Sequence, residues 1–271
     1  MPPPLYTQTV IAFVWDFDKT LIPSNMQNPI FDFYDVDPDT FWTEVEGLPD
    51  YYGRNGVVIQ RDTAYLGHFL TYVREGKFEG LSNAKLRELG AALDPVPGMP
   101  DFMEATRAHV AEIPEFVNEG ITVEHYVVST GIREMIEGSA YGPVIDGVWA
   151  NTFIENVAEP GYLTRLPVSP GPGPISHVGY TIDNTSKTRA IFEINKGVNK
   201  IPGLDVNARM APEQRRVPMK NIIYIADGPS DVPVFSILNT SGGRTLGVYM
   251  LEPDNNHAKV KALQEQGRIQ G

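Results

Sequence analysis

The stretch that most constrains this chain is an apolar run, Val10–Trp15, which is followed by two acids, Asp16 and Asp18. A short run of this composition predicts a strand of a parallel sheet that is buried on both faces. In open α/β sheets, ligands bind at the carboxyl ends of the strands. The two carboxylates are therefore candidates for a catalytic or metal site, although Asp and Lys after a strand can also be ordinary turn residues.

Polar residues also follow a second apolar and β-branched run, residues 122–128. This run predicts another strand, and we expect Ser129, Thr130 and Gly131 to form a turn that leads into a helix near Ile132. Such a turn presents hydroxyl and N–H groups to an anion. It is also ordinary helix-capping chemistry, so taken alone it leaves both interpretations open.

A third strand and one lysine complete this pattern. Residues 221–226 predict a buried strand, and Asp227 and Asp231 follow it. Lys187 stands at the start of a helix expected just after Asp183, where the helix dipole disfavours a cation unless an anionic partner holds it there. If the three strands are parallel neighbours, their ends share one edge of the sheet and these polar groups converge on one crevice.

The chain from about Pro29 to Glu119 has a different character, because it shows helical periods and few strand signals. We expect helices over residues 39–47, 57–76, 82–93 and 99–117. The predicted fold class is therefore α/β, a doubly wound, Rossmann-like and mainly parallel sheet with an inserted helical cap domain. The expected division is a catalytic core of residues 1–25 and 119–271 and a cap of residues 26–118.

Composition narrows the classes of partner. The 271 residues are 42% apolar, which is enough for one large core with an insertion. The net charge of −12 argues against a nucleic acid or an anionic membrane as partner. The absence of cysteine excludes disulfides and thiolate metal sites. No run approaches the ~20 apolar residues of a membrane span and no signal peptide is evident, so we expect a cytoplasmic protein, of open oligomeric state.

Taken together, the motifs resemble the four ordered motifs of the haloacid dehalogenase (HAD) superfamily. The matching segments are residues 15–21 (WDFDKTL), residues 127–131 (VVSTG), Lys187, and residues 226–231 (ADGPSD). More narrowly, the chain resembles the phosphoserine-phosphatase-like branch, in which a helical cap is inserted between the first and second motifs. The resemblance implies a Mg²⁺-dependent phosphomonoester hydrolase that acts on a small phosphorylated metabolite.

The resemblance also implies roles for the site residues. Asp16 would be the nucleophile that forms an aspartyl-phosphate, and Asp18 would be the general acid and then the general base. Asp16, the main-chain carbonyl of Asp18, and Asp227 would bind Mg²⁺, which prefers such hard oxygen ligands. Asp231 would position Lys187 or a metal-bound water. The residues implied to bind phosphate are Ser129, Thr130, Gly131 and Lys187.

Two departures from the family pattern stand out. Lys19 follows the second aspartate, where many members of the family have glycine. The separation between Lys187 and Asp227 is long for this branch, so Lys196 and Lys200 remain alternatives for the phosphate-binding lysine.

The cap would set substrate specificity, and Arg61 and Tyr65 are candidates for contact with the substrate. A closed crevice would exclude polymers and favour a small metabolite. Alternative activities on the same core are phosphoryl transfer by a phosphotransferase and carbon–halogen hydrolysis by a dehalogenase. Dehalogenation is disfavoured because it has no use for Asp18 as an acid or for a metal. A non-catalytic metabolite-binding protein is the remaining alternative, and it would be expected to lose a catalytic acid.

Overall fold

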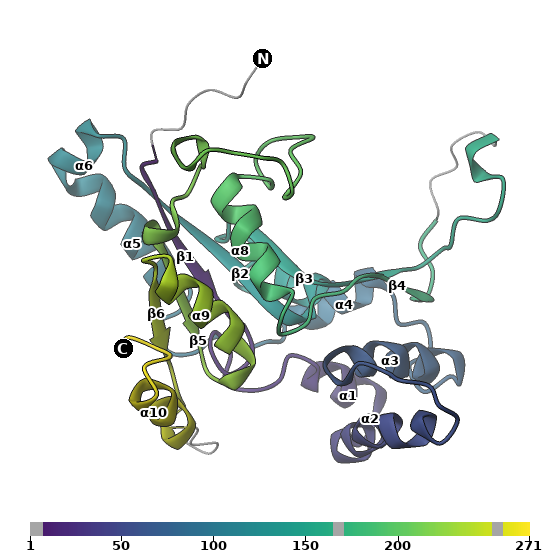
Figure 1. The fold of residues 1–271 in the computed structure, drawn as a ribbon. Helices are drawn as coiled ribbons and strands as arrows, with labels where there is room; N and C mark the ends of the chain where they lie inside the picture. Colours follow the sequence, from purple (N-terminus) through teal and green to yellow (C-terminus); the bar gives the residue numbers. More distant parts are fainter. Residues whose placement is uncertain (1–7, 165–170, 251–256) are drawn as a thin grey trace.

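In a computed structural model of the chain, residues 8–164, 171–250 and 257–271 are described (Figure 1). Within them, strands form a six-stranded sheet of order β4-β3-β2-β1-β5-β6. All neighbouring strands are parallel except β3 and β4, so the predicted doubly wound α/β fold is confirmed. The strands are β1 (Val10–Trp15), β2 (Thr122–Ile132), β3 (Gly147–Ile154), β4 (His177–Tyr180), β5 (Ile222–Ala226) and β6 (Arg244–Gly247).

The helices of the described residues are α1 (Asn28–Tyr34), α2 (Pro38–Gly53), α3 (Ala64–Arg74), α4 (Asn83–Gly90), α5 (Asp101–Glu112), α6 (Pro114–Asn118), α7 (Arg133–Gly138), α8 (Lys187–Lys196), α9 (Val232–Thr240) and α10 (His257–Glu265). Single 3₁₀ turns are η1 (Arg61–Thr63), η2 (Tyr162–Thr164), η3 (Pro212–Gln214), η4 (Met219–Asn221) and η5 (Pro229–Asp231). None of these helices is long and apolar enough to cross a membrane.

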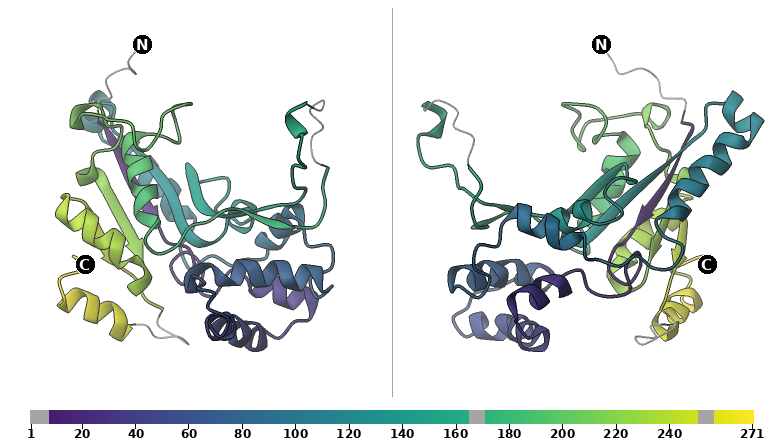
Figure 2. Two further views of the ribbon diagram at one scale, coloured as in Figure 1. Left: turned by 45° about the vertical axis from the view of Figure 1, so that its right-hand side comes forward. Right: turned by 180° about the vertical axis from the view of Figure 1, so that it is seen from behind.

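Strand β1 separates two apolar layers, because successive side chains of a strand point to opposite faces. Val10, Ala12 and Val14 pack in a cluster with residues of α8, α9 and α10. Phe13 and Trp15 belong to the other cluster, to which α4, α5 and α7 contribute. Figure 2 shows the sheet between these two helical layers. Helices therefore cover both faces of the apolar run, and Ile11 and Phe13 on one face are half-buried rather than fully buried.

Strand β1 is also the topological switch point of the sheet. The chain proceeds from β1 to β2 and β3 on one side and later to β5 and β6 on the other. At such a point the loops that follow neighbouring strands diverge and leave a crevice at the carboxyl ends. The segments that follow β1 and β5 and the end of β2 carry the three predicted motifs, so the topology brings them together.

The insertion between β1 and β2 contains α1 to α6. Helices α1, α2 and α3 lie beside the carboxyl ends of the strands (Figures 1 and 2) and share an aromatic cluster. In it, the ring of Phe41 lies 5.0 Å from that of Phe31 and 5.1 Å from that of Phe69. Helix α5 instead packs on the sheet, where the ring centroid of Phe102 lies 6.1 Å from that of Trp15. The division into core and cap stays a prediction. The contact of α5 with the sheet shows that one helix of the predicted cap packs against the core.

The expected helices differ from the observed ones in three places. Helix α1 was not expected from the sequence. Residues 57–60 are not helical, and α3 begins only at Ala64, after the turn η1. The expected helix over 99–117 is two helices, α5 and α6, because Pro114 lacks the N–H that would continue α5 and instead starts α6.

Helix α4 of the insertion packs closely on helix α7 of the core through two glycines. A Cβ atom added to Gly90 of α4 would lie 2.2 Å from the carbonyl oxygen of Met135. A Cβ atom added to Gly138 of α7 would lie 2.0 Å from the carbonyl oxygen of Arg87. An ion pair between Arg87 and Glu137, 2.6 Å long, spans the same contact. The absence of side chains at the two glycines therefore permits this close helix contact.

We expect Gly90→Ala and Gly138→Ala each to lower the free energy of unfolding by about 1–3 kcal/mol, because the added methyl group overlaps backbone atoms. Gly47→Ala is the control, since it lies within α2 and nothing is within 4 Å of an added Cβ. That control should be neutral or stabilising by up to about 1 kcal/mol, the gain in helix propensity. Urea unfolding measures the free energy of unfolding of all three variants. Equal changes in the two contact variants and in the control would contradict the close contact.

Candidate active site

The turn after β1 places two acids at the switch point. The N–H of Asp16 donates to the carbonyl of Ile225 in β5 (2.9 Å), which keeps this residue in the plane of the sheet. The carbonyl of Phe17 then accepts the N–H of Leu21 at 2.8 Å, so the chain reverses over Asp18 and Lys19. Lys19 has a φ of 58°, in the left-handed region that glycine adopts at least cost. The structure thus explains why glycine suits this position, where this chain has lysine.

Lys187 lies within hydrogen-bond distance of Asp16 and of Asp231. Its Nζ donates to Asp16 Oδ1 at 2.8 Å and to Asp231 Oδ1 at 2.7 Å. The side chain is 1% exposed. Lys187 is also the first residue of α8, as expected, and the two carboxylates supply the anionic partners that offset the unfavourable dipole there.

Three carboxylates form one cluster around this lysine. Oxygen atoms of Asp16, Asp227 and Asp231 all lie within 4.8 Å of one another. Asp231 also accepts hydrogen bonds from the hydroxyls of Tyr224 (2.5 Å) and Ser230 (2.8 Å). These two hydrogen bonds and the one from Lys187 hold the Asp231 carboxylate in place. Asp231 is therefore well placed to position Lys187.

Burial and mutual repulsion change the protonation of the acids. Burial raises the pKa of Asp16 to about 8; Lys187 opposes this rise and Asp231 adds to it. Burial also raises the pKa of Asp18 to about 7, against the lowering effect of the Met26 N–H. The pKa of Asp227 is raised by burial and then by Asp231. Burial alone would lower the pKa of Lys187, but Asp16 and Asp231 raise it, so the ammonium group stays charged.

This donor set fits a divalent cation such as Mg²⁺. The cluster offers only carboxylate oxygens, the hard ligands that Mg²⁺ prefers. Burial is the main cause of the raised pKa values of Asp16 and Asp18, and repulsion from neighbouring carboxylates adds to it. The ligands predicted from the family resemblance, Asp16, the Asp18 carbonyl and Asp227, remain a prediction.

The second motif corrects one expectation. Ser129, Thr130 and Gly131 do not form a turn before a helix; they continue β2, which runs to Ile132. The pairing with β3 shifts register between Val128 and Ile132, so an irregular strand takes the place of the turn. Ser129 is buried, and its hydroxyl accepts the N–H of Gly131 at 3.0 Å. Their proposed contacts with phosphate remain a prediction.

Met26 joins the first and second motifs, a role that no pattern in the sequence indicates. Its N–H donates to Asp18 Oδ1 at 3.1 Å, while its sulfur accepts the N–H of Ile132 at 3.0 Å. A Cβ at Gly131 would lie 2.1 Å from the terminal methyl of Met26. Glycine at position 131 therefore leaves room for the side chain of Met26 next to Asp18.

The insertion contacts the core at the second motif. The hydroxyl of Tyr65 donates to the carbonyl of Thr130 at 2.7 Å and accepts from Asn151 Nδ2 at 3.1 Å. Asn151 is fully buried in β3, and its side-chain oxygen accepts the N–H of Ile182. Arg61, the other specificity candidate, is exposed in η1 and does not line the pocket next to Asp18. The structure thus places Tyr65 at the site and leaves Arg61 outside it.

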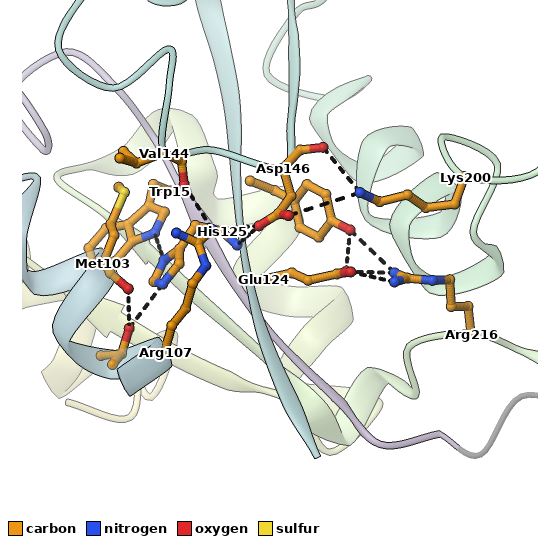
Figure 3. A network of polar contacts seen from close by, with 11 residues as sticks. Trp15, Met103, Arg107, Glu124, His125, Val144, Asp146, Lys200 and Arg216 are labelled. Carbon is orange, nitrogen blue, oxygen red and sulfur yellow. Dashed lines mark hydrogen bonds and ion pairs between the residues drawn. The ribbon is translucent and has the colours of Figure 1, made fainter. Parts of the chain in front are cut away.

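The two alternative lysines lie elsewhere. Lys196 donates to the carbonyls of Val206 and Ala208, at 2.5 and 2.7 Å. Lys200 lies 4.0 Å from Asp146, at the amino-terminal end of β3 (Figure 3). Of the three lysines considered, Lys187 is therefore the one at the site.

Figure 3 also shows how Trp15, the residue before Asp16, is held. Trp15 Nε1 donates to His125 Nδ1 at 3.1 Å, and His125 Nε2 lies 3.0 Å from Thr106 Oγ1. Because that hydroxyl donates to the Met103 carbonyl, Nε2 carries the imidazole proton and the ring is neutral. Burial lowers the pKa of His125 to about 4, in agreement with this assignment. The network ties the end of β1 to α5.

The fold and the converging motifs define a doubly wound α/β protein with an acidic site at the switch point and a helical insertion after the first motif. This is the arrangement that the resemblance to the HAD superfamily predicts. No protein-family model matches the chain. The chain belongs to the same family as an uncharacterized protein of Borreliella burgdorferi, to which it is 44% identical over 234 residues, 86% of this chain and 79% of that protein.

Solved structures with a similar course of the chain include a phospho-aspartyl intermediate analogue of phosphoserine phosphatase, with a TM-score of 0.48 and 13% identity. That match covers 97% of this chain and 100% of the other. A HAD family hydrolase from Salmonella enterica serovar Typhi has a TM-score of 0.49 and 14% identity; the match covers 89% of this chain and 63% of that one. At such low similarity, the chemistry of this chain rests on its own site geometry.

The raised pKa values predict how the stability of the metal-free protein depends on pH. Asp16 and Asp18 bind protons in the folded state up to about pH 8 and 7, whereas unfolded Asp titrates near ~4. The unfolded state therefore binds fewer protons, and stability falls as pH rises through these folded pKa values, by up to about 1.4 kcal/mol per pH unit for each group.

Urea unfolding in EDTA between pH 6.5 and 8.5 measures this fall. His125 is neutral in the folded protein throughout this range. Asp16→Asn is the matched variant, and it should show a smaller fall because one of the two groups no longer titrates. Stability that rises with pH in this range, or an equal fall in Asp16→Asn, would contradict the protonation states assigned to the site.

Proposed function

We propose that this protein is a Mg²⁺-dependent phosphomonoester hydrolase that acts on a small phosphorylated metabolite through an aspartyl-phosphate on Asp16. The observation that carries the proposal is the buried Lys187, held between Asp16 and Asp231 beside Asp227. This combination provides a nucleophile, a cation for the phosphoryl oxygens and carboxylates for a metal ion at one strand end.

The proposed reaction has two steps. A carboxylate oxygen of Asp16 attacks phosphorus while the bond from phosphorus to the ester oxygen breaks, and Asp18 gives its proton to the leaving oxygen. Asp18, now ionised, takes a proton from a water molecule that attacks phosphorus, which releases inorganic phosphate and regenerates Asp16. The pKa of Asp18, raised by burial to about 7, suits both roles near neutral pH.

The remaining groups orient the reactants and offset charge. Lys187 would bind a phosphoryl oxygen, together with Ser129 and the backbone N–H groups of Thr130 and Gly131. Bound Mg²⁺ would supply additional neutralisation of the charge that develops on the phosphoryl group. Asp231 would keep Lys187 in position through their 2.7 Å hydrogen bond.

The space beside Asp18 supports a small substrate. The pocket there has a volume of about 310 Å³ and is lined by residues of both the core and the insertion. A pocket of this size suits a small metabolite. No role for nucleic acid is proposed, in keeping with the net charge of −12, and a cytoplasmic location stays a prediction.

Phosphate release from p-nitrophenyl phosphate tests the proposal. We expect turnover that is lost in EDTA and restored by Mg²⁺, and we expect Asp16→Asn to lower kcat by about a thousandfold or more. Asp94→Asn removes an exposed acid outside the site and serves as the control, with unchanged activity expected. Turnover in EDTA, or full activity of Asp16→Asn, would refute the mechanism.

A further inference from the structure

The pocket beside Asp18 contains a second acid, contributed by the insertion. Asp62 of η1 lines this pocket across from the catalytic turn. Within the described residues its carboxylate makes no hydrogen bond or ion pair through its side chain. No lysine or arginine of the described chain lines the pocket, since the neighbouring Arg61 lies outside it. The charged side chains that line the pocket are therefore those of Asp18 and Asp62.

Two aromatic side chains of the insertion line the same pocket. The ring centroids of Trp42 and Tyr65 lie 5.8 Å apart, and their planes are inclined by 49°. The hydroxyl of Tyr65 is already bonded to Thr130 and Asn151, which fixes the position of this ring. Aromatic rings near a carboxylate are the combination that attracts organic cations, through their π faces and through direct charge attraction.

A glutamine side chain lines the same pocket and can contact a ligand there. Gln27 is 4% exposed and lines the pocket, but no hydrogen bond of its side chain is found within the described residues. Because the amide atoms themselves are accessible in the pocket, they offer a hydrogen-bond donor and an acceptor to a polar group of a ligand.

A carboxylate on the leaving group would be unfavourable here. It would approach Asp62 without any cation of the pocket wall to offset the repulsion. Lys187 cannot serve this purpose, because it is held at the phosphoryl end between Asp16 and Asp231. A positive nitrogen on the leaving group would instead gain attraction from Asp62 and from the aromatic rings.

We propose that this pocket binds the alcohol part of the substrate, and that this alcohol carries a cationic nitrogen and no carboxylate. The inference rests on the proposed phosphatase function and specifies its substrate class. Asp62, Trp42 and Tyr65 are the specificity-determining residues, with Asp62 as the electrostatic contact.

Matched substrates test this inference on the Mg²⁺-loaded full chain. Phosphocholine is compared with 3,3-dimethylbutyl phosphate, which has the same shape but carbon in place of the charged nitrogen. Phosphoethanolamine is compared with propyl phosphate in the same way, and with phosphoserine, which adds a carboxylate. In at least one of the two pairs, we expect kcat/KM to be at least tenfold higher for the cationic ester than for its neutral counterpart. We also expect kcat/KM to be higher for phosphoethanolamine than for phosphoserine.

Variants identify the contact. Asp62→Asn should reduce the ratio of kcat/KM between the cationic ester and its neutral counterpart toward one, and Asp62→Lys should invert it. Asp50→Asn, which removes an exposed acid of α2 outside the pocket, should leave the ratio unchanged. A ratio that survives Asp62→Asn would overturn the assignment of Asp62.

The two proposals fail in different ways. If p-nitrophenyl phosphate is hydrolysed but neither cationic ester is preferred over its neutral counterpart, the substrate class is wrong and the phosphatase function stands. Preference for phosphoserine over phosphoethanolamine would likewise overturn the inference. If no ester is hydrolysed with Mg²⁺ present, the phosphatase function itself is wrong.

Discussion

The burial of Lys187 between two carboxylates is the interaction on which the site depends. A single ammonium group at hydrogen-bond distance from Asp16 and Asp231 orients both acids and keeps a cation at the end of β1. Removing one member of such a buried set leaves an uncompensated charge, a loss of about 3–5 kcal/mol in comparable cases. The sheet order supplies the geometry, because β1 lies between β2 and β5 and α8 begins with this lysine.

The site is completed by residues that lie outside the strand-end motifs. Met26 connects the Asp18 carboxylate to the end of β2, and Tyr65 reaches from α3 to the Thr130 carbonyl. Gln60 also donates a hydrogen bond to Asp183, just before α8. The insertion is therefore held against the core at the second motif and beside the lysine helix. This closure creates the pocket that would select the leaving group.

The sequence predicts those features of the fold and site that local pattern encodes. The apolar run before Asp16 indicates a buried strand with acids at its end. The unusual lysine at a helix start indicates an anionic partner, and together these features indicate one shared crevice. Tertiary contacts decide the rest: the register shift that keeps Ser129 to Gly131 in β2 has no local signature. In the sequence, Met26 looks like any other apolar residue, and Asn151 looks like any other polar residue of a strand. Their roles appear only when the insertion and β3 meet the second motif.

The most direct test of the central claim is to find the covalent intermediate. The Mg²⁺-loaded protein is mixed with an ester that it hydrolyses, quenched in acid during turnover and cut into peptides for mass spectrometry. The account predicts phosphate on the peptide that contains Asp16, attached to that carboxylate, and none in Asp16→Asn. Phosphate on a different residue, or turnover by a protein that never carries phosphate at Asp16, would contradict it.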